Sequence, residues 1–121
     1  MNRYGFPKRV RLLRPADFRR VYSEGRRRNL DWLVAFSLAT GDRSSRIGFT
    51  VPAAFGPAVD RNRIKRQLRE AVRKHWSELG PGWDIVLNPR RAALELEFPR
   101  IGETVCKLFR SCARVRSDAG S

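Results

Sequence analysis

The stretch Arg61–Arg73 constrains the fold more than any other part of the sequence, because it carries two different stripes at helical spacing. A helix turns by about 100° per residue, which gathers its apolar side chains in one narrow sector. These apolar residues are Ile64, Leu68, Ala71 and Val72. Along the flank lie cationic residues, namely Lys65, Arg66, Arg69 and Arg73. The sequence therefore predicts a helix that packs by one face and presents a row of positive charge beside it, spaced to meet successive anionic groups of a polymer.

The overall charge also favours a polyanionic partner. The 121 residues include 26 Lys and Arg against 12 Asp and Glu, which gives a formal net charge of +14. Of the basic residues 22 are Arg, whose planar guanidinium binds phosphate with two hydrogen bonds and stacks on exposed bases. We therefore expect binding to nucleic acid that weakens as salt rises, and RNA is favoured over a membrane surface.

Length and composition predict one domain over residues 1–121, with a basic arm at 1–14 and a flexible tail at 115–121. No apolar run approaches the roughly 20 residues of a membrane span, and no signal-peptide core follows the N-terminal basic residues. A cytoplasmic protein is expected. Cys106 and Cys112 are six residues apart in a predicted helix and have no second pair for a zinc site, so both are interpreted as reduced.

The first half of the chain reads as a helix followed by two strands. A helix is predicted from Pro15 to a stop at Gly25, with Phe18, Val21 and Tyr22 on one side. Alternating apolar residues then predict strands at 30–38 and 46–51, and these two strands are expected to be antiparallel neighbours.

The second half begins with the cationic helix. It is expected to start near Asp60, whose carboxylate is favoured as a cap for free N–H groups, and to end before Gly80. A buried strand at Trp83–Leu87 and a helix at Phe98–Arg114 follow. The glycines lie at boundaries and turns, so a glycine-rich phosphate loop is not indicated.

Three motifs resemble the protein subunit of bacterial ribonuclease P. They are I-G-F-T-V at 47–51, G-P-A-V at 56–59 and R-N-R-I-K-R-Q-L-R-E at 61–70. The D-F-x-x-V-Y-x-x-G element at 17–25, an apolar strand at 33–38 and the closing helix agree more loosely, so the resemblance covers roughly residues 9–112.

The resemblance implies an α+β fold, a compact two-layer α/β sandwich ordered α-β-β-β-α-β-α. The cationic helix would then form a left-handed crossover between parallel strands. It also implies a function as the protein subunit that joins a large catalytic RNA and assists endonucleolytic removal of the 5′ leader from precursor tRNA. Hydrolysis would belong to Mg²⁺ held by the RNA, with no catalytic residue, metal or obligate protein partner expected for the protein itself.

The family's functional residues can be carried over where this sequence matches. Contact with the RNA subunit falls to Arg61, Asn62, Arg63, Lys65, Arg66 and Arg69. The single-stranded leader would enter a cleft between the first helix and the sheet, lined by Phe18, Tyr22 and Phe36. Exposed rings stack on bases of any identity while nearby cations hold the backbone, which suits an enzyme that meets many leaders. On spacing alone, the same rings also fit a plain core.

The sequence departs from the family pattern beside this cleft. Two lysines expected after the second apolar strand are replaced by Ala53 and Ala54, and an Ala-Arg pair after the last strand is replaced by Asn88 and Pro89. Nearby basic residues are the predicted substitutes, namely Arg46, Arg90 and Arg91. His75 lacks a nucleophile or metal partner in sequence reach and is interpreted as structural.

Two other functions compete with this interpretation. An independent protein nuclease would need clustered carboxylates or histidines to hold metals or move protons, and the acidic residues here are scattered singly. A structural RNA-binding protein of ribosomal type would share the size, charge and architecture. The ordered R-N-R motif together with the paired aromatics of the first helix favours the ribonuclease P subunit over it.

Overall fold

The computed structural model describes residues 8–41 and 43–120. Within these residues, a short 3-10 helix at Lys8–Val10 is followed by three α-helices and four strands, besides further short 3-10 helices. They are α1 (Pro15–Glu24), β1 (Arg26–Asn29), β2 (Leu33–Ala39), β3 (Arg46–Phe49), α2 (Ala58–Lys74), β4 (Trp83–Pro89) and α3 (Phe98–Gly120). The predicted order α-β-β-β-α-β-α is confirmed.

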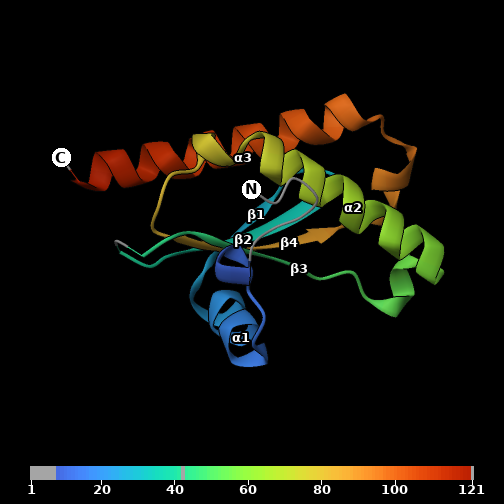
Figure 1. Cartoon of the computed structure of the whole chain (residues 1–121), viewed down its shortest axis with the longest axis horizontal. Coiled ribbons are helices and arrows are strands. Elements are labelled where there is room, and N and C mark those ends of the chain that lie inside the picture. The colour runs from blue at the N-terminus through green and yellow to red at the C-terminus, as the bar shows by residue number, and fades with distance from the viewer. Residues whose placement is uncertain (1–7, 42, 121) are drawn as a thin grey trace.

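The four strands form one sheet in the order β1-β2-β4-β3. The pairs β1–β2 and β2–β4 are antiparallel, whereas β3 and β4 are parallel and are connected through α2. The predicted crossover of the cationic helix between parallel strands is therefore present (Figure 1). The expectation that the strands at 30–38 and 46–51 are neighbours was wrong, because β4 lies between them and pairs with both.

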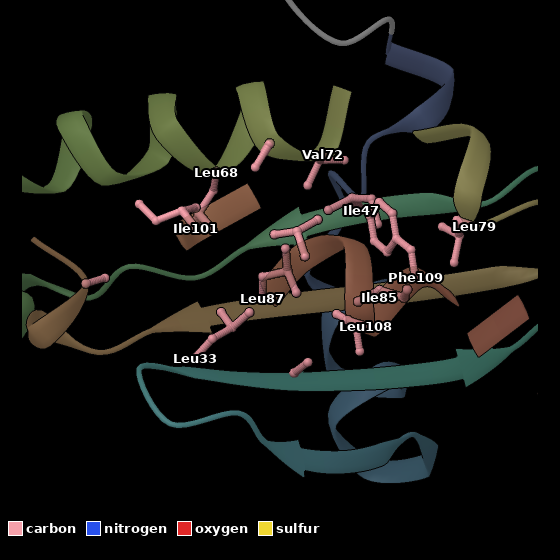
Figure 2. Close-up of a cluster of buried hydrophobic side chains, with 14 of the residues drawn as sticks. Leu33, Ile47, Leu68, Val72, Leu79, Ile85, Leu87, Ile101, Leu108 and Phe109 are labelled. Atoms are coloured by element: carbon pink, nitrogen blue, oxygen red, sulfur yellow. The ribbon is translucent and has the colours of Figure 1, made fainter. Parts of the chain in front are cut away.

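Helices cover both faces of the sheet, with α2 and α3 on one side and α1 on the other (Figure 1). The main core lies under α2 and α3, where Leu33 and Ile85 from the strands meet Leu68 and Phe109 from the helices (Figure 2). A smaller cluster of Leu12, Val21 and Val86 lies under α1. The central strand β4 packs on both faces, which explains why it is almost continuously apolar.

The first strand was not located by hydrophobic pattern. Arg26–Asn29 contains three arginines and no apolar residue, yet it pairs along its whole length with β2. The apparent alternation of Leu30 and Trp32 belongs to the turn between the strands. Asp31 has a φ of 72°, and its N–H donates to Asn29 Oδ1. Asn and Asp stabilise such turns, so they were the available signal for the break before Leu33.

Part of the predicted basic arm is packed against the sheet. Val10 and Leu12 are buried, and the Leu12 N–H donates to the Ile47 carbonyl, with Arg11 forming a parallel bridge to the same residue. Residues 1–7 of the arm lie outside the described part of the chain. At the other end, α3 continues to Gly120, beyond the predicted helix end at Arg114 and into the predicted tail.

Asp60 does not cap α2, contrary to the expectation. The helix begins at Ala58 after Pro57, without a side-chain hydrogen bond at the cap, and Asp60 lies inside its first turn. Its Oδ2 instead accepts from Arg91 Nη1 at 3.4 Å. A carboxylate in the first turn still interacts favourably with the positive end of the helix dipole.

Two further expectations concern cysteine chemistry and membranes. Both Cys106 and Cys112 are free thiols on α3, as predicted. Among the described residues, no helix combines the length and apolar character that crossing a bilayer requires.

Candidate nucleic-acid interface

The apolar stripe of α2 anchors the helix and thereby fixes where its charges point. Ile64, Leu68, Ala71 and Val72 are fully buried against the sheet and α3. Asn62, Arg63, Arg66 and Arg69 are exposed, while Arg61 and Lys65 are half-buried at the border. The structure thus brings all six predicted contact residues onto the solvent-facing side and flanks of one helix.

Most of these cations are available for a partner. Within the described part of the chain, Arg63, Lys65, Arg66 and Arg69 make no side-chain hydrogen bond and no ion pair. Arg61 is oriented by its Nε, which donates to the Gly56 carbonyl at 3.0 Å. One turn beyond Arg69, Arg73 is paired with Glu70 at 2.6 Å. The free charge therefore concentrates on the amino-terminal and central turns of α2.

The three aromatic residues predicted for the leader also come together, at the junction of α1 and the sheet. Tyr22 and Phe36 meet edge to face, with ring centroids 4.8 Å apart. The Tyr22 hydroxyl is hydrogen-bonded to Thr50 Oγ1 at 2.7 Å and to Asn88 Oδ1 at 3.1 Å. Asn88, which departs from the family pattern, therefore helps to orient the ring.

Phe18 completes this aromatic cluster from the amino-terminal half of α1. It lies directly over Gly48 of β3, where a Cβ atom would come within 2.6 Å of the ring. Phe18, Tyr22 and Phe36 are each half-buried and pack on the small cluster under α1. The rings therefore serve the packing of α1 and still present part of their surface to solvent, so the two interpretations of their spacing are compatible.

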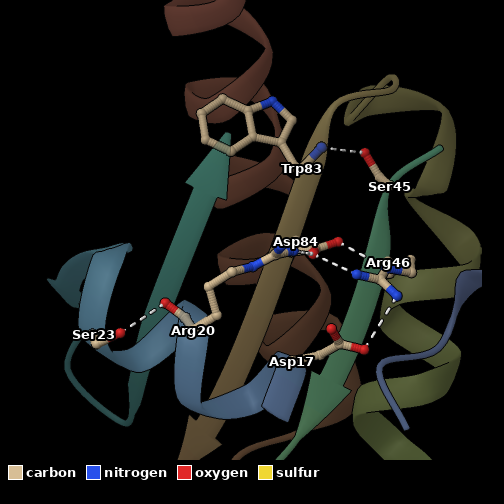
Figure 3. Close-up of polar contacts among 7 residues, drawn as sticks. All are labelled: Asp17, Arg20, Ser23, Ser45, Arg46, Trp83 and Asp84. Carbon is tan, nitrogen blue, oxygen red and sulfur yellow. Dashed lines mark hydrogen bonds and ion pairs between the residues drawn. The ribbon is translucent and has the colours of Figure 1, made fainter. Parts of the chain in front are cut away.

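An ion-pair network joins α1 to the sheet (Figure 3). Asp84 of β4, only 1% exposed, accepts from Arg46 Nε at 3.0 Å and Nη2 at 2.7 Å, and from Arg20 Nη2 at 3.1 Å. Arg46 also pairs with Asp17 of α1 at 3.4 Å. The hydrogen bond with Asp84 raises the pKa of Arg46. The network joins α1, β3 and β4.

Sequence reasoning treated Asp84 as one of several scattered acids and missed its role. The signal was present, because a charged residue inside the apolar run Trp83–Leu87 can be buried only with partners. The partners themselves were not readable, since Arg20 and Arg46 are far away along the chain.

The three arginines expected to replace the missing lysines are already engaged. Arg46 is held between two carboxylates. Arg90 Nη1 donates to Asn29 Oδ1 and to the Asp31 carbonyl. Arg91 Nη1 donates to the Phe55 carbonyl at 2.8 Å and contacts Asp60. None of the three is therefore an unpaired cation available to bind a phosphate beside the aromatic cluster.

The described residues contain no group of three or more His, Cys, Asp or Glu placed to hold a metal ion. Asp17 and Asp84, which do come close together, are bound by the shared Arg46. His75 ends α2 and packs against Gly102 of α3.

Comparison with known proteins decides the family. A sequence model of the family described as Ribonuclease P matches residues 6–113. The chain belongs to this family. The "Ribonuclease P protein component" of Roseiflexus sp. (strain RS-1) is 40% identical over 112 residues, which cover 91% of this chain and 92% of the relative. That of Desulforapulum autotrophicum is 35% identical over 118 residues, covering 98% and 99%.

Solved structures agree with the sequence relatives. The ribonuclease P protein from Thermotoga maritima superposes with a TM-score of 0.75 at 30% identity, covering 84% of this chain and 96% of that one. The Staphylococcus aureus protein gives a TM-score of 0.74 at 29% identity, covering 89% and 98%. The chain is therefore a ribonuclease P protein subunit, the protein part of an endonucleolytic ribonucleoprotein that acts in tRNA processing.

Proposed function

We propose that this ribonuclease P protein binds the RNA subunit through α2 and contacts the 5′ leader of precursor tRNA through the aromatic cluster of Phe18, Tyr22 and Phe36. The complex would remove the leader to give the mature 5′ end. The observation that carries the proposal is the exposed face of α2, where Arg63, Lys65, Arg66 and Arg69 have no side-chain partner within the described residues.

The α2 face suits a phosphate backbone better than a single anion. Arg63, Lys65, Arg66 and Arg69 extend over two turns of a helix that is anchored by a fully buried stripe. Because the anchor fixes the helix, the charges need little reordering when phosphates replace their counterions. Release of those counterions supplies much of the affinity and makes it depend on salt.

The aromatic cluster suits a single strand of variable sequence. Stacking on a ring is worth about 1–3 kcal/mol per base and tolerates any base, because every base has a π face. Tyr22 is held in place by Thr50 and Asn88, and α1 is held by the Asp84 network, so the rings are ordered before the leader arrives. The proposed role of the protein is thus binding and positioning.

The proposal leaves the chemistry to the RNA. Mg²⁺ bound by the RNA subunit would supply the metal that hydrolysis requires, and the protein would hold no cofactor of its own. The complex would work in the cytoplasm, where tRNA precursors are made. Cleavage of a 5′-labelled precursor at low Mg²⁺ tests this division, using the RNA alone, the protein alone and both together. Stimulation only in the combination is expected, and cleavage by the protein alone would contradict it.

The α2 interface is tested by removing three of its charges. The triple variant Arg61→Ala, Arg63→Ala and Arg66→Ala should weaken binding to the RNA subunit and flatten its salt dependence by about one unit of slope per lost phosphate contact. A matched control removes three charges from α3, through Arg100→Ala, Lys107→Ala and Arg114→Ala. Equal effects of the two triples would show that only net charge matters and would remove α2 from the interface.

The aromatic cluster is tested by the double variant Phe18→Ala and Tyr22→Ala. Its affinity for precursor tRNA in the holoenzyme should fall, while its affinity for mature tRNA should stay unchanged because mature tRNA lacks the leader. Equal loss for both RNAs would show that the rings act only in packing. Circular dichroism of the variant separates a lost contact from a lost fold.

A further inference from the structure

The edge strand β1 carries three consecutive arginines whose side chains alternate between the two faces of the sheet. Arg28 belongs to the face under α3, because its Nη1 donates to Ser111 at 2.8 Å. Arg26 lies on the same face as Arg28, because residues two positions apart in a strand point to the same side of the sheet. Burial raises the pKa of the Cys112 thiol on α3, and the nearby charges of Arg28 and Arg26 oppose that rise. Arg27 must therefore lie on the opposite face, the one that α1 covers in part.

The strand register places Arg27 beside the aromatic cluster. Arg27 is the direct partner of Phe36 in the antiparallel pair β1–β2. Residues directly opposite each other in such a pair have Cβ atoms about 4.5–5.5 Å apart and on the same face. Phe36 in turn meets the edge of Tyr22. The three side chains therefore form a row that runs from α1 across β2 to the open edge of the sheet.

Arg27 differs from Arg46, Arg90 and Arg91 in being free. It is exposed, and within the described part of the chain its side chain makes no hydrogen bond and no ion pair. Arg46, Arg90 and Arg91 are all bound to carboxylate, amide or carbonyl oxygens of the protein. Strand β1 thus supplies a cation, Arg27, that can approach a phosphate at the aromatic cluster without breaking an existing contact.

We propose that Arg27 binds a backbone phosphate of the single-stranded 5′ leader while the neighbouring bases contact Phe36 and Tyr22, an inference that rests on the proposed leader site. The guanidinium grips phosphate oxygens with two hydrogen bonds, and the adjacent rings accept bases of any sequence. Arg27 would thus supply a positive charge from β1, at the edge of the sheet opposite β3 and the following Ala53 and Ala54.

The test compares two neighbouring arginines that differ in the face they occupy. Arg27→Ala and Arg26→Ala each remove one exposed charge from the same edge strand, so both change the net charge equally. Holoenzyme reconstituted with each variant is titrated with precursor tRNA and with mature tRNA over a range of salt. Arg27→Ala should lose roughly fivefold in affinity for the precursor alone, and its salt slope for the precursor should fall by about one unit. Arg26→Ala should behave as the parent.

The same titration of the Phe18→Ala, Tyr22→Ala double variant separates two kinds of failure. If this double variant loses its preference for the precursor while Arg27→Ala matches Arg26→Ala, the leader site stands and the role of Arg27 is overturned. If neither variant changes the preference, the leader site itself is misplaced. If Arg27→Lys restores the salt slope of the parent, this supports a contact with a phosphate. If Lys restores none of the lost affinity, a charge-dependent contact between residue 27 and a phosphate is overturned.

Discussion

Replacing Asp84 by Asn should destabilise the fold strongly although it removes no volume. Asp84 is 1% exposed and accepts three charged hydrogen bonds, two from Arg46 and one from Arg20. Such bonds contribute about 1.5–3 kcal/mol each, so the three set an upper range of roughly 4.5–9 kcal/mol. The arginines are 24% and 38% exposed and regain water when released, which reduces the loss. We expect about 3 kcal/mol, the lower end for breaking a buried ion pair.

Urea unfolding followed by tryptophan fluorescence measures this loss, and a thermal melt should show a midpoint lower by roughly 10 °C. Asp31→Asn is the matched control, because Asp31 is an exposed carboxylate in a turn, and its stability should stay within about 0.5 kcal/mol of the parent. Arg46→Met should cost less in the Asp84→Asn background than in the parent, since its main partner is already gone. A loss below about 1 kcal/mol for Asp84→Asn would refute the view that this network fixes α1.

Three further predictions concern the core, the thiols and the contact under α1. Phe109→Ala, which empties a fully buried position, should lower the free energy of unfolding by about 3–5 kcal/mol in the same urea assay. At pH 8, iodoacetamide followed by mass spectrometry should modify half-buried Cys106 before Cys112, whose thiol pKa is raised by burial; simultaneous modification would contradict this. Gly48→Ala should destabilise by about 1–3 kcal/mol through its clash with Phe18, and the cost should largely vanish in a Phe18→Ala background, where an unchanged cost would place the strain elsewhere.

The helices could be predicted from sequence because each buries one continuous stripe. In α2 the buried residues are the four that the spacing selected, so the exposed cations followed directly from it. The start of α1 at Pro15 and the start of α3 at Phe98 were likewise set by local signals. The spacing of nearby residues determines where a helix lies and which face is apolar, and in the folded chain these apolar faces are the ones that pack in the core.

The pairing of strands could not be predicted in this way. Alternation in 46–51 shows which residues share a face, but it carries no information about which strand lies alongside, and β4 comes from a distant part of the chain. β1 has no apolar residue at all, and its pairing with β2 is imposed by the tight turn at Asp31. The hand of the crossover came only from family resemblance, since most parallel connections are right-handed.

The candidate site likewise has features that the sequence could predict and features that it could not. Its members were predictable, because cation spacing and aromatic spacing are local properties of α2 and α1. It was not predictable which cations would remain unpaired, because their hydrogen-bond and ion-pair partners come from distant parts of the chain. Arg46 was expected to serve the leader and is instead held by Asp84, whereas Arg27 was passed over and is free.

The two edges of the sheet are protected from pairing with another copy in different ways. Beyond β3, the segment at Arg11 and Leu12 bonds to Ile47 and occupies that border with backbone of the same molecule. Beyond β1, a second copy would have to bring three arginines against three others, which like-charge repulsion opposes. Both edges thus disfavour strand-by-strand pairing between copies of this chain, and its net charge of +14 adds a general repulsion between molecules.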